Sequence, residues 1–279
     1  MFDRLCRPNT ALALGYIASA ALVLIYVNMF PLWKHLSSRW EREVFVFVPI
    51  LLGFGIIAIV CILFYRRLQS APLSVGKGGL AIGIFLCLIA LTVPDPQFPV
   101  KRIHVAEYML LSLVVRFTMS IKLHGLPLLL FSACFASLLG VHDELLQGLH
   151  PSRTYGLRDL LVNTLASFSG AMIWHNLQLF SWTTSSADKQ TATSKITSLM
   201  YLVWLITTVL VFVLPLVLYR GSTIPYWPAM PLIGAIVYFG LYRDHFAMSW
   251  KHGIGALSVV SFALILYPII NDVKVVLFF

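Results

Sequence analysis

Charged residues are scarce in this chain of 279 residues, where Asp, Glu, Lys and Arg make up only 11% and hydrophobic residues 59%. An ordinary soluble domain has about 25% charged residues. So few charged residues argue against a soluble fold, because they could not cover the surface that such a fold exposes to water. The apolar residues instead form runs near the ~20 that cross the hydrocarbon core of a bilayer. The sequence therefore predicts an all-α, polytopic transmembrane helix bundle.

Acidic residues are rarer still, and the formal net charge is +9. The Lys and Arg residues are scattered in short stretches between apolar runs, which favours anionic lipid headgroups over nucleic acid as their partner. The predicted partners are thus membrane lipids, with other membrane-protein subunits as an alternative and no nucleic acid.

Chemical motifs are also few. The four cysteines Cys6, Cys61, Cys87 and Cys134 follow no CxxC or metal spacing and are interpreted as packing residues. The chain has no phosphate-binding loop, Rossmann glycine turn, nucleophile elbow or haem-attachment motif. No cofactor is predicted.

Hydropathy predicts about nine spans, and eight are possible because three of the runs are short. The predicted spans cover residues 11–30, 44–65, 80–93, 105–120, 126–146, 160–179, 196–218, 227–241 and 254–270. The first run is longer than the ~7–15 apolar residues of a secretory signal, so it is interpreted as an uncleaved span. A cytoplasmic N-terminus leaves slightly more than half of the 20 Lys and Arg residues inside, which favours that orientation.

Two polar segments interrupt this composition, at residues 101–108 and 142–163. By the span count, one precedes the fourth span and the other joins the fifth and sixth, so both lie at the same membrane face. Helical spacing puts His104 and Glu107 on one helix face, and likewise Asp143 with Gln147. Carboxylates facing lipid are costly, so a polar site between helices is predicted.

These segments resemble the VanZ-like family of integral membrane proteins over about residues 80–180. The motifs are HVAEY at 104–108, DELLQ at 143–147, PSR at 151–153, then Asp159, Asn163 and Gly170. The resemblance implies a four-helix core at 80–180, with two helices before it at 1–79 and three after it at 181–279. It also implies a cell-envelope role in the bacterial cytoplasmic membrane, with the motif side facing outward.

The first functional hypothesis is binding of an anionic lipid headgroup or a lipid-linked glycan. Lys101, Arg102, Arg153 and Arg158 supply positive charge, and the N-terminal ends of two helices add backbone donors. The predicted ligand-binding residues are Lys101, Arg102, His104, Glu107, Asp143, Glu144, Gln147, Arg153, Asp159 and Asn163.

Two other hypotheses stay open. In a membrane-embedded hydrolase or transferase, Glu107 or Glu144 would be the general base, His104 an acid or base, and Arg153 the stabiliser of an oxyanion or phosphate. In a structural or accessory subunit of a larger complex, the same side chains would only lock the helices together, for example through a Glu144–Arg153 clamp.

Simpler roles exist for single residues. Asn163, Ser167 and Gly170 form a small-residue stripe suited to close helix packing, and Asp159 could only cap its helix. The polar segments also contain residue types that bind zinc, namely His104, Glu107, His142, Glu144 and His150. Their spacing matches no zinc motif, so no metal site is predicted.

Overall fold

The computed structural model describes residues 8–37, 62, 65, 76–95, 99–149, 156–178, 192–219 and 225–272. All regular elements within these ranges are helices, which confirms the predicted all-α fold. The predicted span at 44–65 lies outside the described residues, apart from two isolated positions.

The helices follow the predicted apolar runs closely. They are α1 (Pro8–Ser37), α3 (Lys77–Thr92), α4 (Ile103–Met119), α5 (Gly125–Gly148), α6 (Leu157–Asn176), α7 (Ala192–Leu218), α8 (Ala229–Leu241), α9 (Met248–Ala263) and α10 (Leu266–Asp272). Two short 3₁₀ helices, η2 (Pro99–Arg102) and η3 (Arg243–His245), lead into α4 and α9.

Four segments of the described chain are long and apolar enough to cross a membrane: Pro8–Met29, Gly125–Gly148, Ser194–Leu218 and Met248–Ile270. Helices α3 and α8 are apolar but have only 16 and 13 residues, fewer than the ~20 of an untilted span. The four long helices identify a membrane protein, while the count of about nine spans stays a prediction.

The last predicted span is divided into α9 and α10 by a break at Leu264 and Ile265. Pro268 explains it, because proline lacks the N–H that would bond the carbonyl four residues back, at Leu264, and its ring clashes there. At the break the backbone has a hydrogen bond between residues three apart, as in a 3₁₀ turn: Leu264 N donates to Ser261 O at 3.1 Å.

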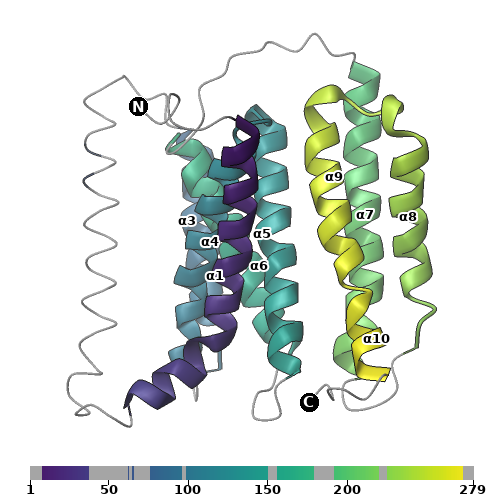
Figure 1. Ribbon diagram of the computed structural model, residues 1–279. Helices are drawn as coiled ribbons and strands as arrows, with labels where there is room; N and C mark the ends of the chain where they lie inside the picture. The colour runs from purple at the N-terminus through teal and green to yellow at the C-terminus, as the bar shows by residue number, and fades with distance from the viewer. Residues whose placement is uncertain are drawn as a thin grey trace.

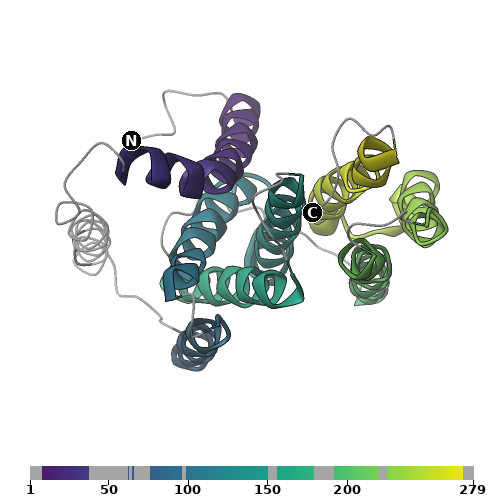
Figure 2. The same ribbon diagram turned by 90° about the horizontal axis from the view of Figure 1, so that it is seen from below.

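Helix α6 is the centre of a first group of helices, in which it packs against α3, α4 and α5 while α1 covers α4 and α5 (Figures 1 and 2). Gly170 lets α6 approach α4 closely. A Cβ atom built there would lie 2.9 Å from the Met109 Cα and would collide with the Ser112 hydroxyl. A small residue at this position therefore sets the spacing of the two helices.

Helices α7 to α10 form a second group beside the first (Figures 1 and 2). Its own helices are joined by hydrogen bonds to backbone groups: Tyr201 of α7 donates to Ala235 O of α8 at 2.9 Å, and Ser198 accepts from Ala247 N at 3.0 Å. The two groups meet mainly where α9 packs against α5.

Candidate functional site

Three helix ends carry the polar segments. Helix α4 begins, α5 ends and α6 begins at the same end of the bundle, the lower end in Figure 1. Seven polar side chains from these ends are buried: Glu107, Tyr108, Asp143, Glu144, Gln147, Asp159 and Asn163. Together they form a carboxylate cluster, which consists of Glu107, Asp143, Glu144 and Asp159 with the side chains that contact them.

Glu107 is held by its own helix and by α1. Its Oε2 atom lies 2.9 Å from the Nδ1 of His104, one turn earlier in α4. The hydroxyl of Tyr26 in α1 donates to the Glu107 carbonyl oxygen at 3.0 Å. The predicted helical pair is thus in direct contact, and α1 fixes the backbone beside it.

Asp143 is fully buried between α5 and α4. The hydroxyl of Tyr108 donates to its Oδ2 atom at 2.6 Å. Gln147, one turn further along α5, lies beside the same carboxylate.

Glu144 connects α5 to α6. Its Oε1 atom accepts a hydrogen bond from Asn163 Nδ2 at 3.0 Å, and both side chains are at most 1% exposed. The Oε2 atom of Glu144 and the Oδ1 atom of Asn163 are buried and accept no hydrogen bond from any described residue. Buried polar atoms are normally satisfied, so these two oxygens require a donor.

Basic side chains form the rim of the cluster. Lys101 Nζ lies 2.8 Å from Asp159 Oδ2, and the Lys101 side chain is 34% exposed. Arg158 NH1 lies 3.3 Å from Asp95 Oδ2. Arg102 is exposed and donates from Nε to the Leu91 carbonyl oxygen at 3.2 Å. Buried carboxylates thus have an outer border of cations.

The cluster contains more acidic than basic groups. His104 lies within electrostatic range of Glu107, Asp143 and Glu144. Among the described residues, the ion pairs of the cluster are those of His104 with Glu107 and of Lys101 with Asp159. Within the same part of the chain, no group of His, Cys, Asp or Glu is arranged to hold a metal ion.

The structure brings together eight of the ten predicted ligand-binding residues in the carboxylate cluster, and Arg102 lies outside it, against the Leu91 carbonyl oxygen. Arg153, and with it the predicted Glu144–Arg153 clamp, lies outside the described residues, as does His150. His142 points away from the cluster: its Nε2–H donates to Val260 O at 2.9 Å, and its Nδ1 lies 3.0 Å from the Tyr267 hydroxyl.

Sequence reasoning missed two tyrosines. Tyr108 belongs to the HVAEY motif and follows Glu107 directly, so the motif itself pointed to it. Tyr26 lies in the first apolar run, far from either polar segment, and no signal in the sequence singled it out.

The fold and the site define a helical membrane protein with a buried carboxylate cluster at one end of its bundle. No family model matches the chain, and neither a curated protein nor a solved structure matches it. The VanZ-like resemblance therefore stays a prediction.

Proposed function

We propose that this chain is a VanZ-like cell-envelope protein of the bacterial cytoplasmic membrane, with about nine spans, whose carboxylate cluster binds a lipid-linked glycan or an anionic lipid headgroup at the extracytoplasmic face. The observation that carries the proposal is a set of buried acceptor oxygens to which no described residue donates, among them Glu144 Oε2 and Asn163 Oδ1.

The chemistry of these acceptors favours a ligand rich in hydroxyl groups. A sugar hydroxyl can donate to a carboxylate or an amide oxygen, and hydrogen bonds to a charged group contribute about 1.5–3 kcal/mol. A phosphate in the same position would face four carboxylates and be repelled. The glycan part of a lipid-linked sugar therefore suits the interior better than a bare phosphate does.

The rim suits the anionic part of the same ligand. Lys101 and Arg102 are partly or fully exposed near the start of α4, and Arg158 is 58% exposed in the first turn of α6. Arginine binds phosphate through a planar fork, and helix N-termini favour anions. A phosphate would bind at this border while its sugar extends inward.

A structural role is the second candidate, because the Tyr108–Asp143 and Asn163–Glu144 hydrogen bonds join α4, α5 and α6. Such a polar lock would need no ligand. It would leave the two acceptor oxygens unexplained, which is why binding is preferred.

The first test is Glu144→Gln in the purified full-length chain. The variant keeps an oxygen for Asn163 but removes the charge and one acceptor. We expect binding of a prenyl-phosphate-linked disaccharide to weaken by about tenfold to a hundredfold, measured by ligand titration, with the protein accumulating normally. Asp244→Asn is the control, since its side chain is 98% exposed at the other end of the bundle.

The same titration separates the alternatives. Phosphatidylglycerol binding in place of the disaccharide would identify the anionic headgroup as the ligand. Unchanged binding but lost turnover of the disaccharide probe would identify an active site. If the wild-type chain binds neither probe, the binding proposal is wrong.

Orientation has a direct test by cysteine labelling in a chain whose four native cysteines are replaced by alanine. Gly156→Cys, at the start of α6, is expected to react with an impermeant thiol reagent outside intact cells, because the cluster faces outward. Lys122→Cys, exposed between α4 and α5 at the opposite end, is expected to react only after lysis. The reverse pattern would place the cluster in the cytoplasm.

A further inference from the structure

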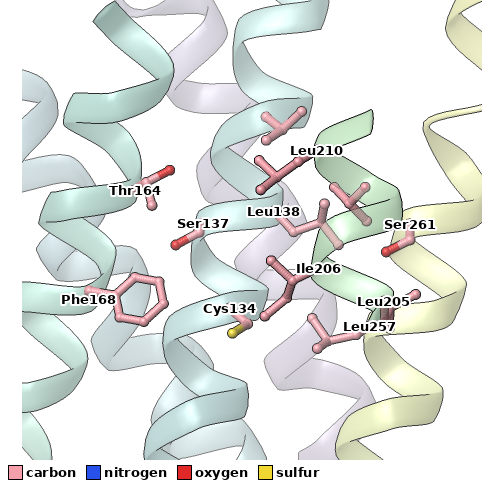
Figure 3. A pocket seen from close by; sticks show the side chains of 12 residues that line it. Cys134, Ser137, Leu138, Thr164, Phe168, Leu205, Ile206, Leu210, Leu257 and Ser261 are labelled. Carbon is pink, nitrogen blue, oxygen red and sulfur yellow. The ribbon is translucent and has the colours of Figure 1, made fainter. Parts of the chain in front are cut away.

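A second feature lies between the two helix groups. A groove with a cavity of about 130 Å³ is lined by residues of α5, α6, α7 and α9. Ser137, Phe168, Ile206 and Leu257 line it, one from each helix (Figure 3). Its lining is almost entirely apolar, and the Ser137 hydroxyl is already bonded to the Ala133 carbonyl oxygen of its own helix at 2.8 Å.

The groove suits a hydrocarbon chain in both size and chemistry. An apolar cavity of about 150 Å³ in another protein stays dry and binds benzene, so this one accommodates roughly six carbon atoms. Leu210 lines the groove and is 55% exposed, so the lining includes a side chain that also reaches the outer surface of the helix bundle.

The groove lies one helical turn from the carboxylate cluster along α5, although none of its lining residues belongs to the cluster. Val141 lines it, and Glu144 follows three residues later in α5, a rise of about 4.5 Å along the helix. On α6, the lining residue Thr164 directly follows Asn163. The two helices that carry the unsatisfied acceptors are thus the two that form one wall of the groove.

We propose that the groove holds the hydrocarbon chain of the amphiphile whose headgroup lies in the carboxylate cluster. This inference rests on the proposed binding function and makes the ligand more specific: the protein recognises the junction of a polar head and a lipid chain. A single molecule then contacts both helix groups, with its head on α5 and α6 and its chain against α7 and α9.

The test compares two probes on the full-length chain, a prenyl-phosphate-linked disaccharide and the same headgroup with a methyl group in place of the prenyl chain. The wild-type protein is expected to bind the prenyl form about tenfold more tightly or better, because several methylene groups are buried. Val209→Trp, which fills the groove from α7, is expected to remove this preference without weakening binding of the methyl form. Val203→Trp is the matched control, since Val203 is 57% exposed and does not line the groove.

The outcomes distinguish the two proposals. If neither probe binds the wild-type chain, the proposed function fails. If both bind and Val209→Trp keeps the preference, or weakens both probes equally, the groove inference is overturned while the binding function stands. Should Val209→Trp not fold, Ser137→Leu fills the groove from α5. A photoreactive prenyl chain on the wild-type protein gives an independent result: cross-links to Val141 or Leu210 support the inference, and cross-links confined to other helix faces overturn it.

Discussion

Gly170→Val is expected to destabilise the protein by about 3 kcal/mol or more and to remove most of it from the membrane fraction. Overpacking usually costs about 1–3 kcal/mol. Here even the first added carbon would meet the backbone of α4, at 2.9 Å from Met109 Cα, and a backbone cannot rotate away as a side chain can. The measurements are the amount of protein in the membrane and its unfolding temperature in detergent.

Gly234→Val in α8 is the matched control, because nothing lies within 4 Å of a Cβ atom built there. The two variants share the change in helix propensity and differ only in packing. Equal accumulation of both would mean that α4 and α6 do not approach each other as closely as the structure has them.

Asn163→Leu is expected to destabilise the protein by about 1–3 kcal/mol, since it removes the donor from Glu144 and leaves a buried carboxyl oxygen without its hydrogen bond. The double variant Glu144→Leu with Asn163→Leu removes both partners. It is expected to recover part of the lost stability, because two apolar side chains can pack together. Reversible unfolding in detergent measures the recovery.

The double variant also separates the polar lock from a binding site. A stable double variant that no longer binds the disaccharide probe would show that the pair does more than hold helices together. A stable double variant with full binding, and full biological function in cells, would mean that the cluster has only a structural role.

Much of the helix arrangement was predictable from the sequence. Hydropathy predicted residues 126–146 as a span, and α5 runs from Gly125 to Gly148, so that the DELLQ motif forms its last turns. The spacing of His104 and Glu107 predicted a shared helix face, and the two side chains are in contact. Both results depend on features local to one helix: the length of an apolar run in the first case and the helical repeat in the second.

Contacts between side chains of different helices were not predictable in the same way. Asp159 and Asn163 share a helix face, yet one pairs with Lys101 and the other with Glu144. These partners depend on how α4, α5 and α6 rotate against each other, which apolar periodicity does not specify. The Tyr26 contact with the Glu107 backbone depends in the same way on where α1 packs.

Two further details of the structure follow from local rules. Pro268 should have divided the last span, since proline breaks helix hydrogen bonding four residues earlier. His142 precedes Asp143, and one helical step turns a side chain by about 100°. Its bond to Val260 on α9, rather than to the cluster, follows from that rotation.

The pairing of Glu144 with Asn163 has a consequence for the synthesis of the protein. The polar end of α5 leaves the ribosome before α6, so Glu144 has no Asn163 to bond with while α5 alone is in the translocon. A carboxylate near a helix end can stay in interfacial water during that interval, whereas one at the bilayer centre could not. The hydrogen bond between Glu144 and Asn163 can therefore form only after α6 has followed α5 into the bilayer.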